Sequence, residues 1–127
     1  MKKTFSTHWK ASKQPRKQRK YLYNAPLHVR AKHLKSHLSK ELRARHQTRS
    51  LRVRTGDEIR VMRGQYAGKS GKVDRVDTVR TRIYVSGVDQ TKRDGTKKPY
   101  PLQPSNIMIT KLADDKRRLP AKTQVKA

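Results

Sequence analysis

The chain has 127 residues, of which 34 are Lys or Arg and only 9 are Asp or Glu, so its formal net charge is +25. The absence of cysteine excludes a disulfide framework, a thiolate metal site and a cysteine nucleophile, and no apolar run approaches the roughly 20 residues of a membrane span. Uncompensated charge of this size opposes compaction and predicts a polyanionic partner, with nucleic acid favoured over membrane. Because no hydrophobic signal segment follows the amino terminus, we expect a cytoplasmic protein.

The positive charge is concentrated in the first half of the sequence. Residues 1–54 contain 17 basic residues, one acidic residue and all five histidines, whereas residues 55–110 contain all six glycines. We therefore expect four parts: a basic extended arm (1–23), a helical extension (24–52), a small β domain (53–112) and a basic carboxyl-terminal tail (113–127).

The arm has too few apolar residues to form a core of its own. It is either a disordered solubilising tail or, as we favour, an extended segment that becomes ordered along RNA as phosphates neutralise its charge. Trp9, Tyr21 and Tyr23 suit stacking on unpaired bases, and they equally suit packing on the β domain or on a neighbouring protein. The candidate RNA contacts of the arm are Lys13, Arg16, Lys17, Arg19 and Lys20.

Residues 24–52 have the pattern of one kinked helix or two short ones. Asn24 suits an N-cap and Pro26 the first turn, and Ser36 or Ser39 suits the start of a second helix. An apolar stripe with i, i+4 spacing comprises Leu27, Ala31, Leu34, Leu38 and Leu42. The opposite face is basic with almost no acid, which favours phosphate contact over a merely solvated surface. Its candidate RNA-binding residues are Arg30, Lys32, His33, Lys35, Arg43, Arg45 and Arg49.

His33, His37 and Glu41 share one face of such a helix at i, i+4 and i+8, which is also a metal-ligand spacing. A single carboxylate among many cations makes a poor metal site, so we expect histidines that bind RNA or lie at the surface, with no metal and no cofactor.

Three carboxylate pairs lie close in the sequence: Asp57 and Glu58, Asp74 and Asp77, and Asp114 and Asp115. Turns, a strand surface and the tail account for them, so we expect no enzymatic activity.

Residues 53–112 contain the strands. Ile59 and Val61 alternate with polar positions, as in a half-buried strand, and two further strands are expected around residues 73–79 and 83–88. The expected core consists of Val53, Ile59, Val61, Val73, Val76, Ile83, Val85, Val88, Leu102, Ile107 and Ile109.

Between the first two of these strands lies a loop with three glycines, Gly64, Gly68 and Gly71. Glycine permits positive φ and brings backbone amides close to a ligand, and the surrounding cations suit phosphate. The candidate RNA contacts here are Arg63, Gln65, Tyr66, Lys69, Ser70 and Lys72, together with Asn106 from the turn at 104–106.

Asp94-Gly95 predicts a hairpin turn, and the basic residues Lys92, Arg93 and Lys97 on its flanks are further RNA-binding candidates. The prolines at 99 and 101 favour an edge strand or extended segment. A closing strand is expected at 107–109.

The segment GDEIRVMRGQYAGKSGKV resembles the KOW motif. That resemblance implies a mainly β fold, a small SH3-like barrel with an α extension, whose glycine loop lies against nucleic acid. Ribosomal proteins and transcription elongation factors share this motif, so the rest of the chain has to distinguish them.

The segments SKQPRKQRK, NAPLHVR, LSKELRARH and PLQPSNIMITKL, placed in this order around the KOW segment, resemble the archaeal and eukaryotic form of large-subunit ribosomal protein twenty-four, from about Ser12 to Leu112. The resemblance implies a structural constituent of the large ribosomal subunit that binds large-subunit rRNA early in assembly. It also implies a position near the exit of the peptide tunnel, with the hairpin at 89–98 close to that exit. The implied partners are rRNA and neighbouring large-subunit proteins, with no membrane and no homo-oligomer.

Two other classes compete with this expectation. A KOW-bearing elongation or antitermination factor usually carries an α/β domain before the KOW segment, where this chain has a basic arm. A sequence-neutral chromatin protein is favoured by charge alone, and it predicts equal affinity for duplex DNA and rRNA.

Overall fold

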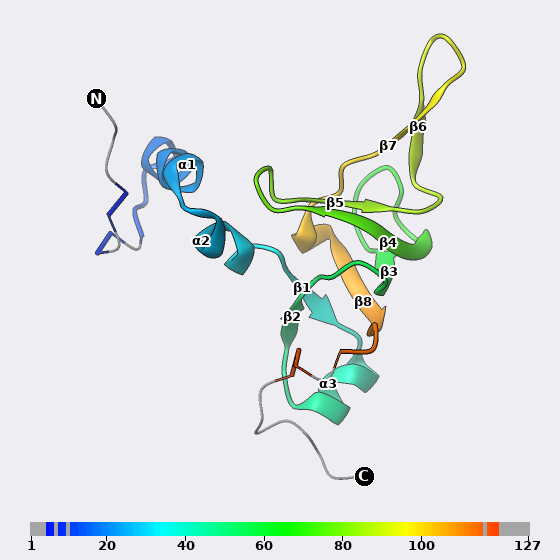
Figure 1. The fold of residues 1–127 in the computed structure, drawn as a ribbon, viewed down its shortest axis with the longest axis horizontal. Helices are drawn as coiled ribbons and strands as arrows, with labels where there is room; N and C mark the ends of the chain where they lie inside the picture. Colours follow the sequence, from blue (N-terminus) through cyan, green and yellow to red (C-terminus); the bar gives the residue numbers. More distant parts are fainter. Residues whose placement is uncertain (1–4, 7, 10, 116, 120–127) are drawn as a thin grey trace.

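The computed structural model describes residues 5–6, 8–9, 11–115 and 117–119 (Figure 1). In chain order its elements are α1 (Pro15–Asn24), α2 (Leu27–Lys32), β1 (Lys35–Leu38), α3 (Lys40–His46), β2 (Ser50–Arg52), β3 (Glu58–Val61), β4 (Ser70–Asp77), β5 (Arg82–Val85), β6 (Asp89–Thr91), β7 (Lys97–Pro99), the 3-10 helix η1 (Pro104–Asn106) and β8 (Ile107–Lys111). The fold is mainly β with helical segments, as expected. Within the described residues, no helix is both long and apolar enough to cross a membrane.

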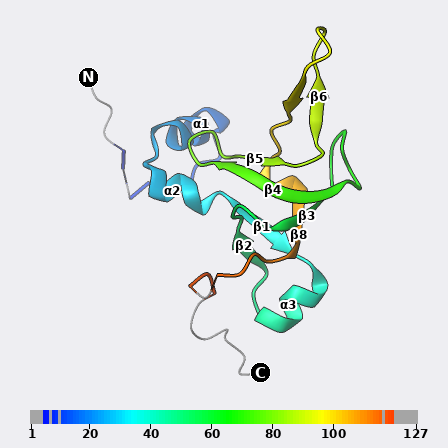
Figure 2. The same ribbon diagram turned by 45° about the vertical axis from the view of Figure 1, so that its right-hand side comes forward.

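One six-stranded sheet organises the molecule. Its strand order is β2-β1-β8-β3-β4-β5, and β6 pairs with β7 in a separate two-stranded hairpin. Every named pair is antiparallel except β1 with β8, which runs parallel with Leu38 opposite Ile109. Two views show the hairpin projecting from one end of the sheet and α3 lying at the other (Figures 1 and 2).

The core matches the expected one closely. Ten of its eleven expected residues are buried, and Val76 is partly buried against them; Leu34 and Leu38 complete the cluster. β4 ends at Asp77, so Val79 lies beyond the strand and is 58% exposed. The edge segment after β7 is extended as predicted, because Leu102 exchanges two backbone hydrogen bonds with Ile83.

The prediction of helix through Leu34 and Leu38 is wrong. Both lie on or beside β1, where Ser36 and Leu38 face inward and Lys35 and His37 face solvent. An i, i+4 spacing fits a strand as well as a helix, since four is a multiple of the two-residue strand period. The stretch is a strand because the edge of β8 is available: the Ser39 amide donates to the Ile109 carbonyl at 2.9 Å.

The ends of the helices follow local chemistry. α3 begins where predicted, with the Ser39 hydroxyl accepting a hydrogen bond from the Leu42 amide at 3.3 Å. Asn24, expected as an N-cap, instead ends α1, and Pro26 is the N-cap of α2. The arm, expected to be extended, is helical over α1, which begins at a proline and is rich in lysine, arginine and glutamine.

Candidate nucleic-acid interface

The glycine loop joins β3 to β4 and is held by its own backbone. Gly64 and Gly68 have φ of 96° and 88°, a region that other residues rarely adopt. The Gly68 amide donates to the Val61 carbonyl at 2.8 Å, and the amides of Ala67 and Lys69 donate to carbonyls within the loop. These three amides are occupied by these hydrogen bonds and are not available to a ligand.

Gly71 has a different role from the other two glycines. It lies in β4, paired with Ile59, and a Cβ on it would come within 2.5 Å of the Ser86 carbonyl oxygen and 2.8 Å of Val85 Cγ1. Glycine is required here for close packing between β4 and the segment after β5, and not for loop flexibility.

Tyr66 fastens the loop to the base of the hairpin. Its hydroxyl donates to the Asp89 carbonyl at 2.9 Å, its ring lies 4.9 Å from that of Tyr100, and the Lys69 ammonium stands 5.1 Å from its centroid. Asn106 is also structural, since its carbonyl accepts a hydrogen bond from the Met62 amide at 2.7 Å. These contacts give Tyr66 and the backbone of Asn106 a role in the fold, and RNA contact by their side chains stays a prediction.

The remaining candidates of the loop are open to solvent, and they define the loop surface. Its members are Arg63, Gln65, Lys69, Ser70 and Lys72, all exposed. A second surface lies on the projecting hairpin, where Lys92, Arg93 and Lys97 are exposed. At the hairpin tip, hydrogen bonds from the side chain and backbone of Thr96 lower the pKa of Asp94 and hold the turn.

A third surface, the arm surface, is formed by α1 and the residues just before it. Lys13, Arg16, Lys17, Arg19 and Lys20 are exposed, and α1 contributes no buried residue to the protein. No acidic residue occurs in residues 1–40. The arm surface is therefore a concentrated positive charge without a carboxylate of its own.

Two of the predicted RNA-binding arginines are used by the fold. Arg30 donates to the carbonyls of Ala25 at 2.8 Å and Val79 at 2.6 Å, and also to that of Tyr23. These bonds join the end of α1 to the turn between β4 and β5. Arg43 donates from Nε to the Leu38 carbonyl at 2.8 Å. Both guanidinium groups satisfy carbonyl oxygens, which gives them a structural role.

The other candidates of the helical extension are exposed but are not gathered on one helical face. Lys32 and His33 lie at the end of α2, Lys35 lies on β1, and Arg45 and Arg49 lie on and after α3. The possible metal spacing is likewise broken up, because His33, His37 and Glu41 fall in three different parts of the fold. Among the described residues, no group of three metal-ligating side chains comes together.

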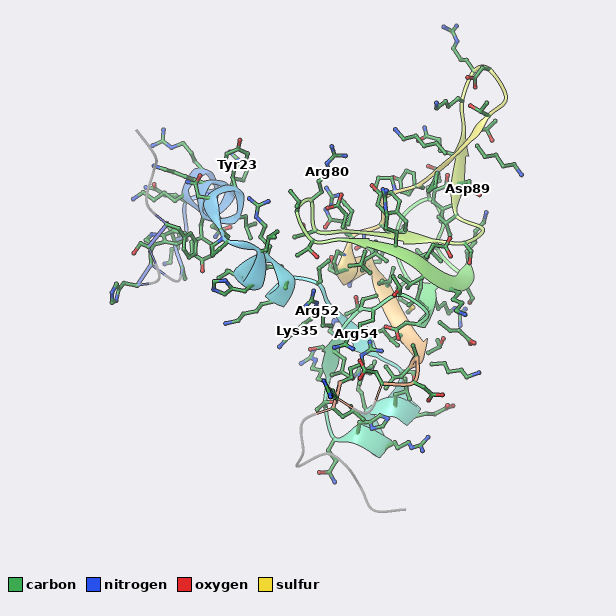
Figure 3. The ribbon with its side chains drawn as sticks, in the orientation of Figure 1. Tyr23, Lys35, Arg52, Arg54, Arg80 and Asp89 are labelled. Atoms are coloured by element: carbon green, nitrogen blue, oxygen red, sulfur yellow. The ribbon has the colours of Figure 1, made fainter. Side chains whose placement is uncertain are left out.

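Sequence reasoning missed a basic groove beside β1 and β2. Lys35 and Arg52 are cross-strand partners, and Figure 3 shows them next to Arg54 on this side of the sheet. The groove has a volume of about 400 Å³ and is lined by Lys35, Thr48, Ser50, Leu51, Arg52, Arg54, Arg117 and Arg118. The Thr48 hydroxyl is buried there without a hydrogen-bond partner within the described chain. Only spatial proximity joins these residues, so no local sequence signal marked them.

Beneath this groove lies a buried ion pair that was also missed. The Asp57 carboxylate is fully buried and receives two hydrogen bonds from the Arg118 guanidinium, at 2.5 and 2.6 Å, with the Arg54 and Ala113 amides at 2.9 and 3.0 Å. Arg118 also donates to the Arg52 carbonyl at 2.7 Å. Asp57 thus fixes the segment after β8 against the start of β3.

A comparison with protein-family models gives one match. Residues 12–121 match the family described as ribosomal proteins L26 in eukaryotes and L24 in archaea. The match covers all three helices, every strand of the sheet, the glycine loop and the hairpin.

Proposed function

Because the chain belongs to the family of eukaryotic L26 and archaeal L24 ribosomal proteins, we propose that its arm, loop and hairpin surfaces bind large-subunit rRNA. Membership of this family makes the chain a non-enzymatic structural protein of the large subunit in the cytoplasmic ribosome. The exposed lysines and arginines neutralise backbone phosphates and release counterions. Backbone contacts of this kind position a protein on RNA, while unpaired bases and RNA shape supply specificity.

One observation carries the proposal: among the described residues, the predicted RNA-binding lysines and arginines that make no hydrogen bond within the fold are exposed. The predicted RNA-binding lysines of all three surfaces are exposed, whereas Arg30 and Arg43 are bonded to carbonyls. The basic groove adds Arg52 and Arg117, both exposed, to the proposed phosphate contacts.

The arm provides the sharpest test. We expect deletion of residues 1–23 to leave the sheet folded, because α1 buries nothing in the core. Binding to an rRNA fragment should weaken, and the slope of log K against log salt should become shallower by about 0.7–0.9 for each phosphate that the arm no longer neutralises. A full-length variant with Arg16, Lys17, Arg19 and Lys20 changed to glutamine separates loss of charge from loss of the helix. An unchanged slope in both proteins contradicts phosphate contacts by the arm.

Assembly and position belong to the same proposal. We propose that the protein joins the subunit early, as a single copy among neighbouring large-subunit proteins, with the β6–β7 hairpin near the exit of the peptide tunnel. Reconstitution with ordered addition of proteins tests the timing: omission of this chain should block later components. Cross-linking from Lys92 or Lys97 to a nascent peptide tests the placement.

The alternative of a transcription elongation factor has no support from the structure beyond the motif that both classes share. It predicts retention of RNA polymerase by the tagged chain, whereas a ribosomal protein sediments with large subunits. A chromatin role predicts equal affinity for duplex DNA and for the rRNA fragment at matched salt.

A further inference from the structure

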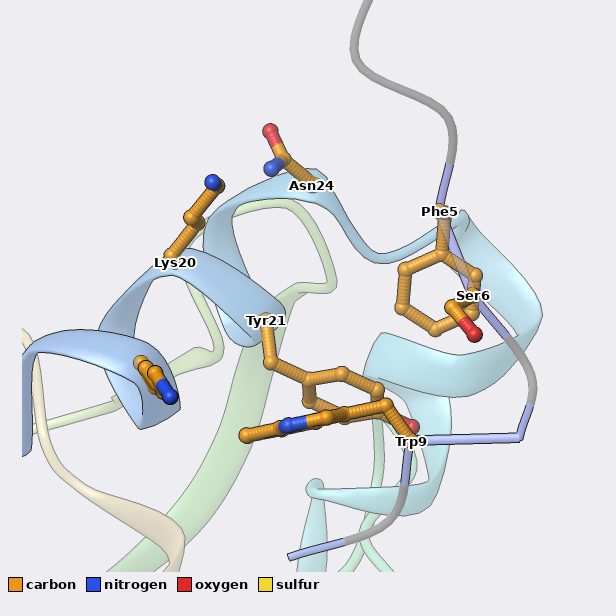
Figure 4. Close-up of a pocket in the computed structure, with 7 residues that line it drawn as sticks. Phe5, Ser6, Trp9, Lys20, Tyr21 and Asn24 are labelled. Carbon is orange, nitrogen blue, oxygen red and sulfur yellow. The ribbon is translucent and has the colours of Figure 1, made fainter. Parts of the chain in front are cut away.

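Three aromatic rings gather beside the second half of α1, apart from the core. The rings of Phe5 and Trp9 each lie 4.9 Å from that of Tyr21, tilted by 40° and 39° (Figure 4). None of the three belongs to the buried core beneath the sheet. Each ring is only partly buried, so the cluster keeps aromatic surface open to a ligand.

These rings form the wall of a pocket with a volume of about 420 Å³, within the range of about 300–1,000 Å³ that is typical of small-molecule sites. The polar part of the lining comes mainly from α1. Lys17, Lys20, Tyr21 and Asn24 are spaced i, i+3, i+4 and i+7 and therefore share one helical face. Ser6 completes the lining, which contains no carboxylate from the described part of the chain.

This combination of groups matches one ligand chemistry better than others. Aromatic rings stack on the flat face of a nucleobase, the amide of Asn24 can both donate to and accept from a base edge, and lysine ammonium groups bind phosphate. An apolar protein side chain would use the rings and leave the two lysines without a counterion. A lone phosphate would use the lysines and leave the rings exposed.

We propose that this pocket receives one unpaired nucleobase of an RNA strand, with Lys17 and Lys20 on the adjoining phosphates. The proposal deepens the rRNA-binding function and rests on it. Phe5 and Trp9 precede the residues 12–121 that match the family, so membership of the family does not itself imply the pocket.

Trp9 is the only tryptophan of the chain, so its fluorescence reports on this pocket in the full-length protein. The probe is a short single-stranded oligoribonucleotide, compared with the same strand carrying abasic sites and with a fully paired duplex. We expect the intact single strand to quench Trp9 at saturation, and the abasic strand and the duplex to bind with little quenching, because neither offers an unpaired base.

Variants on α1 separate stacking from charge. Tyr21→Leu should weaken binding of the single strand by about tenfold, while the control Leu22→Ala, at a neighbouring position 42% exposed on the same helix, should leave it unchanged. Because Tyr21 also supports Trp9, a second variant keeps all three rings: Lys17→Gln with Lys20→Gln should lower affinity and salt dependence while preserving the quenching at saturation.

Several outcomes would contradict the proposal that this pocket binds a nucleobase. Equal quenching by the abasic strand or the duplex would show that the rings do not read a base, and an unaltered affinity of Tyr21→Leu would do the same. Saturation by adenosine monophosphate at the concentration needed for the oligonucleotide would show a free-nucleotide site in place of an RNA strand. Salt-dependent rRNA binding with no change at Trp9 rejects the pocket alone, whereas absence of any rRNA binding rejects the proposed function first.

Discussion

Two arginines packed beside the sheet and the arginines of α1 carry the same group in opposite surroundings. Around the sheet, Arg43 and Arg118 donate to backbone carbonyls or to a buried carboxylate. On α1, Arg16 and Arg19 are exposed on a helix that buries nothing. A net charge of +25 is therefore divided between cations that hold the fold and cations that are available to a partner. Position in the fold, more than residue type, decides which role a guanidinium has.

The largest expected effect on stability comes from removing the hydrogen-bond acceptor of an arginine that holds the fold. Asp57→Ala leaves the Arg118 guanidinium, whose side chain is 4% exposed, with no counter-charge, and it leaves two amides unsatisfied. We expect the free energy of unfolding to fall by about 3–5 kcal/mol, measured by urea denaturation. Asp115→Ala is the control, because its pair with Arg54 is half-exposed and should cost at most about 1 kcal/mol. Equal losses of stability in the two variants would show that the buried pair of Asp57 contributes no more than the exposed pair of Asp115.

The second test concerns packing within the sheet. Gly71→Val places a branched side chain against the Ser86 carbonyl and Val85, both closer than carbon atoms tolerate. We expect a loss of about 1–3 kcal/mol of stability through separation of β4 from the segment after β5. Ser70→Val, at the exposed neighbouring position of the same strand, should have little effect on urea unfolding. An unchanged stability of Gly71→Val would show that Ser86 and Val85 can move to accommodate a side chain at position 71.

Two neighbouring arginines of α3 sharpen the comparison directly. Arg43→Met removes the hydrogen bond to the Leu38 carbonyl, so it should cost about 1 kcal/mol of stability and leave the salt dependence of rRNA binding unchanged. Arg45→Met, at an exposed position, should leave stability unchanged and make the log K slope shallower by about 0.7–0.9. The reverse pattern would place Arg43 on RNA and refute the division.

The smallest expected effect is a pH dependence of the folded sheet. Burial lowers the pKa of His46 below its ordinary value near 6.5, and the charge of Arg45 lowers it further. The unfolded chain therefore takes up this proton at a higher pH than the folded chain, so stability is full above about pH 6.5 and decreases as the pH falls below it. Urea unfolding at several pH values should show a small loss of stability as the pH falls through this range, and the loss should be absent in His46→Gln.

Features with a local cause were predictable from the sequence. The alternation at Ile59 and Val61, the Asp94-Gly95 turn and the Ser39 cap each depend on a few neighbouring residues, and all three were confirmed. The strand at Lys35–Leu38 was not predictable in this way, because its leucine spacing fits two periods and only pairing with β8 decides between them. The same holds for the candidate site: exposed cations were foreseen, whereas the roles of Arg30 and Arg118 depend on partners 49 and 61 residues away.

The place of β8 in the sheet has a consequence for folding during synthesis. This strand, made after all the other strands of the sheet, lies between β1 and β3 and joins the β2–β1 pair to the three strands that begin with β3. Until β8 has been made, the two groups lack the strand that pairs with both of them, and the unfinished sheet exposes apolar strand surface beside a strongly cationic segment. Such delayed, long-range pairing is slow to form. We therefore expect a newly made copy to aggregate less when a chaperone or its polyanionic partner is present until β8 has been released.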